Sequence, residues 1–317
     1  MNKKKYIYIA FGILVCFGLI FFFRKELPAG FNYFYFIMSF FVYTLVLLLR
    51  SYKLNRIINA YTDMSYKEAL SLTASSQLMG AFIPGRAGEI LVSAYLKFKY
   101  TVDISKILPI LFLDKIIELF CVLLYSVFAI LMISGSLFSF VSGNFNGIKS
   151  NNYLVLFSVV IFLIVLILTI IKIYREKLKN ILFNVKQSLL IPLKKPMLGV
   201  IIIFCSFFTI ITEYFYLYLI FHAFNIEITL IKIIVTHSLG MIVGVLSMIP
   251  GGQGSTEVTM LAVLHFWGYT TLMVISPILA SKALTYITLF VYALPLLPYS
   301  ISVLKQRRTS RKRLKNG

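Results

Sequence analysis

Long apolar runs recur along the chain and decide which solvent it can fold in. Each run reaches or approaches the ~20 residues that a helix needs to cross a hydrocarbon layer of ~30 Å. The runs cover roughly residues 6–23, 31–49, 107–134, 153–174, 197–223 and 272–301. Hydrophobic residues make up 60% of the chain and the mean hydropathy is +0.91, far outside the soluble range. The sequence therefore predicts an all-α polytopic membrane protein with about six spanning helices, because a barrel would show short alternating segments instead.

Two polar breaks interrupt two further apolar regions, 67–100 and 233–269. The first break reads Pro84-Gly-Arg-Ala-Gly-Glu89 and the second reads Pro250-Gly-Gly-Gln-Gly-Ser-Thr-Glu257. Proline and glycine stop a helix, and the freed backbone groups must then find partners away from lipid. The arms after the breaks are short, which favours broken re-entrant hairpins that enter and leave on one face. Two tilted full crossings are the alternative, and both choices return the chain to its starting side.

The distribution of basic residues indicates the orientation. If the N-terminus lies in the cytoplasm, 25 of the 31 Lys and Arg residues fall in cytoplasmic segments and four in external ones. Such an excess is the usual orientation signal of membrane proteins. We therefore expect a multi-pass protein of the cell membrane with both termini cytoplasmic. The net charge of +20 is explained by this signal and by attraction to anionic lipid, so we predict no nucleic-acid partner.

The two breaks also predict an internal repeat within a single transmembrane domain, 1–317. Corresponding landmarks, such as Pro84 and Pro250 or Glu89 and Glu257, are separated by 166 to 168 positions. The orientation above makes the second unit inverted relative to the first, as in many secondary transporters. The expected parts are a first helix (1–30), unit one (31–134), a linking helix with a basic cytoplasmic loop (135–196), unit two (197–304) and a basic cytoplasmic tail (305–317). The basic stretch within 175–196 either lies on the inner leaflet or forms a solvated loop.

Ionisable residues inside the apolar segments are the candidates for function, because such groups are costly in a membrane. Lys115 and Lys282 fall ~12–15 Å along their helices, near the middle of a bilayer. Glycine-rich tips expose backbone N–H groups, and a helix that starts after a break presents a positive dipole end to an anion. The candidate headgroup-binding residues are Arg86, Glu89, Lys115, Gly251, Gly252, Gly254, Glu257 and Lys282, and the secondary candidates are Asp114, Glu118 and Glu213. The alternative is that Glu89 and Glu257 only cap helices and that the lysines only pair with them.

Other kinds of site find little support in the sequence. No His, Cys and carboxylate spacing suggests a metal, so we expect no metal and no cofactor. Ser255 has no visible base, which argues against nucleophilic catalysis, and we assign no catalytic residue.

The chain resembles the lysylphosphatidylglycerol synthase transmembrane family, also described as flippase-like proteins. The resemblance rests on the first break, on Asp114-Lys115 and above all on the second break. It implies a polytopic membrane domain that moves lipids, such as aminoacylated phosphatidylglycerol, between leaflets. In bifunctional members a cytoplasmic domain adds lysine from charged tRNA, and we expect that lysyltransferase domain to be lacking here. Members often carry Arg where this chain has Lys115 and Lys282, which weakens a bidentate phosphate contact.

We therefore expect a lipid translocase that moves an anionic or aminoacylated phospholipid, or a polyprenyl-phosphate lipid, between leaflets. The alternative is a membrane-embedded enzyme or accessory subunit of lipid or glycolipid synthesis, and a purely structural scaffold is the third possibility. Such a lipid is the expected partner, with a homo-oligomer or a separate lipid-synthesis enzyme as further candidates.

Overall fold

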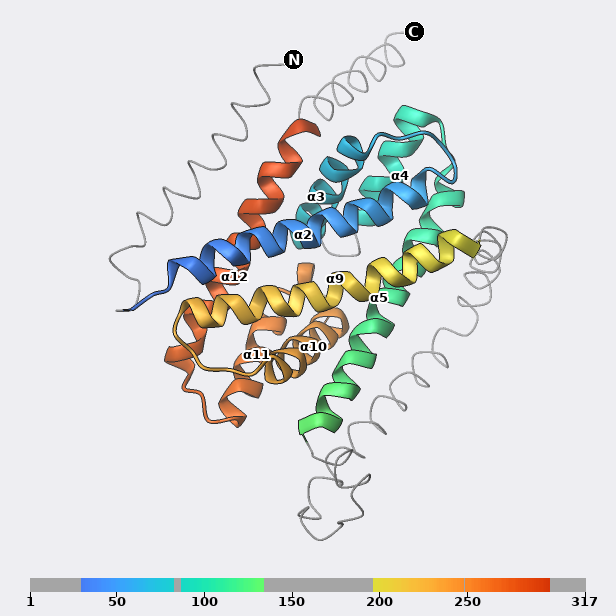
Figure 1. Cartoon of the computed structure of the whole chain (residues 1–317). Helices are drawn as coiled ribbons and strands as arrows, with labels where there is room; N and C mark the ends of the chain where they lie inside the picture. Colours follow the sequence, from blue (N-terminus) through green and yellow to red (C-terminus); the bar gives the residue numbers. More distant parts are fainter. Residues whose placement is uncertain (1–29, 83–86, 134–195, 248, 297–317) are drawn as a thin grey trace.

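The computed structural model describes residues 30–82, 87–133, 196–247 and 249–296, and these residues form helices and no strand. The helices are α2 (Tyr33–Ile58), α3 (Tyr66–Phe82), α4 (Ala87–Tyr100), α5 (Ile104–Ile133), α9 (Pro196–Ala223), α10 (Leu230–Leu246), α11 (Ser255–Phe266) and α12 (Thr271–Ala293), with 3-10 turns η2 (Pro250–Gly252) and η3 (Leu294–Leu296) (Figure 1). The predicted all-helical class is confirmed for this part of the chain.

The apolar helices fit a membrane rather than water. Within the described ranges α2, α9 and α12 are long and apolar enough to cross a bilayer, and α10 is a shorter apolar helix. Large apolar side chains face outward, as at Phe266, which is 85% exposed. Such outward-facing surface is stable only against lipid or a partner. Two of the six predicted crossings, 6–23 and 153–174, lie outside the described residues, so the number of crossings and the side of the termini stay predictions.

Helix α2 is longer than the sequence suggested. Its start agrees with prediction, since the Asn32 side chain accepts the Phe34 N–H at 3.1 Å as an N-cap. The helix continues beyond the predicted apolar run of 31–49 and ends at Ile58. Apolar residues at helical spacing in this extension, including Leu54 and Ile57, are buried in a core with α3, α4 and α5. Burial of this apolar face stabilises the extension of the helix although it contains the charged residues Arg50, Lys53 and Arg56.

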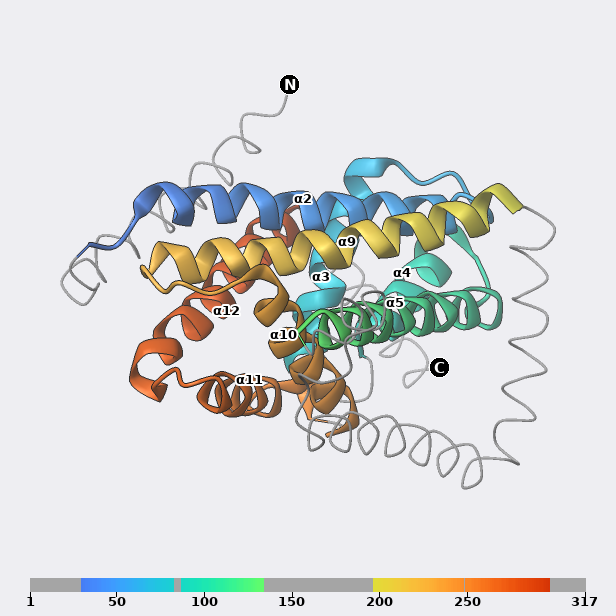
Figure 2. The same cartoon turned by 60° about the horizontal axis from the view of Figure 1, so that its bottom comes forward.

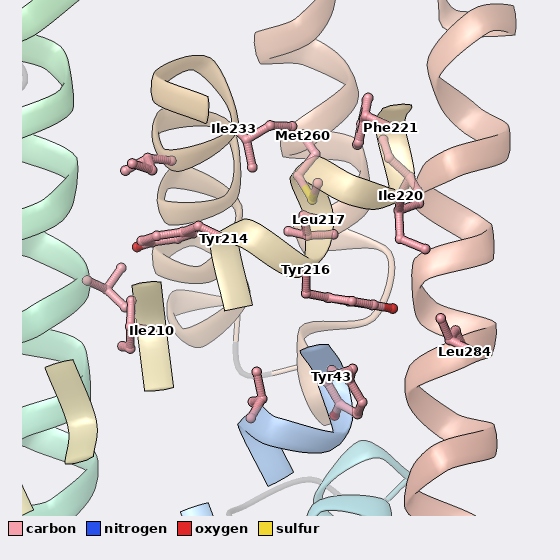
Figure 3. Close-up of a cluster of buried hydrophobic side chains, with 14 of the residues drawn as sticks. Tyr43, Ile210, Tyr214, Tyr216, Leu217, Ile220, Phe221, Ile233, Met260 and Leu284 are labelled. Atoms are coloured by element: carbon pink, nitrogen blue, oxygen red, sulfur yellow. The ribbon is translucent and has the colours of Figure 1, made fainter. Parts of the chain in front are cut away.

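Helices α2 and α9 lie side by side and run in opposite directions (Figures 1 and 2). The Asn32 N–H at the start of α2 donates to the Ala223 carbonyl at the end of α9 at 2.8 Å. Further along, the Tyr43 and Tyr216 rings pack with centroids 5.0 Å apart. The main core is built around α9, whose side chains point towards α2, α10 and α12 (Figure 3).

The two hairpins, α3–α4 and α10–α11, each pack against the other half of the molecule. Helix α3 lies against α12, and α10 lies against α5. Within each hairpin a glycine allows close approach: a Cβ at Gly88 would lie 2.4 Å from the Ser76 carbonyl oxygen, and one at Gly244 would lie 2.4 Å from Thr256 Oγ1. Small residues at such contacts are typical of membrane helices, because they let two backbones approach. The second break thus lies at the end of a closely packed helix pair.

Candidate functional site

The second break lies directly against the C-terminal end of α3. Gly251 has φ +59°, and a Cβ there would lie 2.9 Å from the Ala81 Cα, so this contact requires glycine. Gln253 Nε2 donates to the Ala81 carbonyl and to Tyr286 Oη, both at 2.9 Å. The carbonyl of a helix end, which has no partner within its own helix, is thereby satisfied. The second break therefore packs against the C-terminal end of α3.

Glu257 combines a cap with an ion pair. One carboxylate oxygen accepts the Gly254 N–H at 2.7 Å, which caps the start of α11, and the other lies 2.9 Å from Lys282 Nζ on α12. Gly254 has φ +82°, which favours glycine, and Gly252, with φ +64°, packs against Gly244. The Lys282 and Glu257 side chains keep 29% and 16% of their surface exposed. The pair is thus still accessible from outside the protein.

A second cluster surrounds Lys53 of α2. Its ammonium lies 2.7 Å from Asp114 and 2.6 Å from Glu118, both on α5, and it donates to Ser206 of α9 at 3.0 Å. The Lys53 side chain is only 2% exposed. Glu118 also pairs with Lys115 at 2.7 Å, and the Lys115 side chain stays 34% exposed. This cluster joins three helices from both halves of the molecule.

A third interaction connects α2, α3 and α9. Arg50 donates to Glu213 at 2.7 Å and to the side-chain amide oxygen (Oε1) of Gln77 at 2.9 Å. Both charged side chains are 16% exposed. Glu213, a secondary candidate from the sequence, therefore forms an ion pair with Arg50, which lies just beyond the apolar run of 31–49.

The structure brings some of the predicted residues together and separates others. Glu257 and Lys282 form one pair with the glycines of the second break, whereas Lys115 pairs with Glu118 of its own helix and not with Glu89. The Glu89 carboxylate, in the first turn of α4, makes no hydrogen bond or ion pair with another described residue. Arg86 lies outside the described residues. The structure thus unites part of the proposed site around the second break.

Three polar residues of the interior were missed: Arg50, Lys53 and Gln77. The two cations followed an apolar run and were counted as an orientation signal. Their spacing was the available clue, because Arg50, Lys53 and Leu54 share one helical face that continues the apolar face of α2. Gln77 stands seven residues before the first break, in an apolar arm where a polar amide needs a partner.

The exposed ammonium groups of these clusters can bind an anion. No group of three or more potential His, Cys, Asp or Glu metal ligands occurs within the described ranges. Lys115 and Lys282 each hold a carboxylate and yet remain about one-third exposed, so each ammonium has N–H donors to offer an anion.

Comparison with known proteins supports a membrane role. No curated protein and no solved structure matches the sequence significantly. The model of a family described as "Lysylphosphatidylglycerol synthase TM region" matches residues 9–293, nearly the whole chain. That range includes both breaks and every charged cluster described above. This chain belongs to the lysylphosphatidylglycerol synthase transmembrane-region family.

Proposed function

We propose that the protein moves an anionic or aminoacylated phospholipid, or a polyprenyl-phosphate lipid, between the leaflets of the cell membrane. The observation that carries the proposal is the packing of the second break against the end of α3, where Gly251 and Gln253 contact Ala81, together with the partly exposed Lys282–Glu257 pair. A polar path for a headgroup requires such breaks to face one another inside the bundle, because lipid cannot satisfy broken backbone.

The arrangement of helices supports movement by alternating access. Helices α2 and α9 run antiparallel. Helix α3 of the first half packs against α12 of the second, and α10 of the second half packs against α5 of the first. This is the relation that two inverted units would have, with the hairpins as corresponding parts. In the proposed cycle the units tilt against each other, the headgroup passes between the hairpin tips, and the acyl or prenyl chains stay in the bilayer.

The exposed ammonium groups are the proposed headgroup contacts. Lys282 lies beside the N-terminus of α11, whose backbone N–H groups also favour an anion. A phosphate that approaches Lys282 would compete with Glu257 for the ammonium. The ion pair would thus hold the site closed without lipid and open as the headgroup binds.

Reconstitution tests the proposal. Purified protein in phosphatidylcholine vesicles with fluorescently labelled phosphatidylglycerol should equilibrate the label between leaflets, as followed by chemical quenching of the outer leaflet. Lys282→Gln should slow transfer at least ~10-fold, which corresponds to the loss of one charge-assisted contact. Lys106→Gln is the control, since the Lys106 side chain is 65% exposed and its ammonium lies 3.8 Å from Asp103, which is equally exposed at 66%. Equal rates for both variants would refute the assigned contact, and no transfer of this or a polyprenyl-phosphate probe by the natural protein would refute the function.

A further inference from the structure

His237 of α10 is buried in the polar interior without a partner. His237 is 9% exposed, and neither of its ring nitrogens forms a hydrogen bond with any described residue. The ring packs edge-on against Tyr214, with centroids 5.8 Å apart. Buried polar atoms are nearly always paired, so two unpaired nitrogens in one ring require an explanation.

The surroundings of His237 are charged on several sides. The Tyr214 ring packs against it, the Tyr125 ring of α5 packs against Tyr214, and the Tyr214 hydroxyl shares a 2.7 Å hydrogen bond with Ser238. The charged groups that act on the imidazole are Glu213 of α9, Arg50 of α2, Lys282 of α12 and Glu257 of α11. The electrostatic potential at His237 therefore depends on both the Arg50–Glu213 pair and the Lys282–Glu257 pair.

Among these groups His237 is the one whose protonation a bound anion can change, because burial without a partner favours the neutral ring in the protein without lipid. The lysines and Arg50 are each fixed as cations by a carboxylate within 3 Å. Histidine is the side chain whose charge ordinarily changes between pH 5 and 8. The other two histidines are in different settings: His222 contacts the Tyr218 carbonyl of its own helix at 3.0 Å, and His265 is exposed.

We infer that His237 is a proton-binding residue that carries one proton with each anionic headgroup. This inference rests on the proposed function. On uptake, a proton from water at one membrane face forms an N–H bond with a ring nitrogen, and on release that bond breaks and the proton passes to water at the other face. The protonated ring attracts Glu257 and Glu213, which frees Lys282 to hold the headgroup phosphate.

Two physical arguments favour this coupling. A singly charged headgroup is costly to move through a low-dielectric interior, and one accompanying proton cancels its charge. Coupling between the two binding events is reciprocal: if protonation of His237 strengthens headgroup binding, headgroup binding strengthens protonation by the same factor.

The test uses the full chain in phosphatidylcholine vesicles with labelled phosphatidylglycerol and a pH-sensitive dye in the lumen. If one proton moves with each headgroup, a lumen one pH unit more acidic should enrich the label about tenfold in the outer leaflet at steady state, because one pH unit corresponds to a tenfold ratio. A clamped membrane potential should have no effect, since the pair is neutral. The dye should report a rise in lumenal pH that follows the lipid.

Matched substitutions then locate the proton. His237→Gln should distribute the label evenly despite the gradient, whereas His222→Gln should keep the tenfold ratio. His237→Asn serves as a second variant if the Gln variant does not elute as a folded protein, and the measurement on the natural protein decides the coupling in any case. Transfer by the natural protein without any response to the gradient would overturn the inference and leave the proposed function standing. A full gradient response in His237→Gln would do the same, and the absence of any transfer would overturn both.

Discussion

The Lys53 cluster and the Lys282–Glu257 pair place similar charges in very different surroundings. Lys53 is 2% exposed and contacts two carboxylates and a serine, so all of its donors are occupied within the protein. Lys282 is 29% exposed and has one carboxylate partner, which also caps a helix.

This difference separates a structural role from a functional one. A buried charge that loses its partner is strongly destabilising, so the Lys53 cluster fixes how α2, α5 and α9 pack. An ion pair that water can reach contributes little to stability, so the Lys282–Glu257 pair can open when an anion arrives. The Arg50–Glu213 pair, with both side chains 16% exposed, lies between these extremes.

The largest effect is expected for Lys53→Met. The substitution leaves Asp114 and Glu118 buried side by side with a single remaining cation, Lys115. We expect a loss of ~3–5 kcal/mol in the free energy of unfolding, the usual range for removal of one member of a buried ion pair. Titration with a denaturing detergent measures this loss, and Lys106→Met provides the exposed control. A Lys53→Met protein as stable as its control would contradict the structural role of the cluster.

An intermediate effect is expected for Arg50→Met. The Arg50 side chain is 16% exposed, against 2% for Lys53, so its loss leaves a less deeply buried carboxylate, and we expect a loss of ~1–3 kcal/mol. Arg56→Met is the matched control, because Arg56 lies on the same helix, is exposed, and contacts only the Tyr52 ring at 4.9 Å. The same unfolding titration applies. A loss as large as that of Lys53→Met would show that exposure does not rank these clusters.

The smallest effect on stability is expected for Glu257→Gln. The amide oxygen can still accept the Gly254 N–H, since Gln replaces Glu in capping boxes, and only the exposed ion pair with Lys282 is lost. We expect a change of no more than ~1 kcal/mol in the free energy of unfolding. A loss of ~3 kcal/mol or more would assign this pair to the scaffold together with the Lys53 cluster.

Much of the fold was predictable because lipid imposes simple rules on sequence. The length of the apolar runs predicted helices, and the Pro250–Glu257 break predicted the end of α10 and the start of α11. The spacing of Lys115 and Glu118 placed both on one face of α5, where they form an ion pair. These features depend on local sequence alone.

The partners across helices could not be predicted in the same way. Lys53 looks like a residue at the cytoplasmic end of a span, and only its contact with α5 and α9 reveals it as a buried centre. Gln253 appears as one polar residue in a glycine-rich break, yet it contacts the end of α3, 172 positions away. Such contacts depend on how the two halves pack, which local spacing does not determine.

The most direct test of the central claim is the rate of leaflet transfer by Glu257→Gln, compared with Glu227→Gln in the same vesicles. Glu227 is an exposed glutamate in the loop before α10, so its substitution changes the charge equally without touching the break. We predict a transfer rate for Glu257→Gln at least ~10-fold below that of the natural protein at equal amounts of folded protein, because the headgroup is no longer displaced from Lys282 for release, with Glu227→Gln unchanged. Equal rates for the two variants would contradict a headgroup path beside the second break.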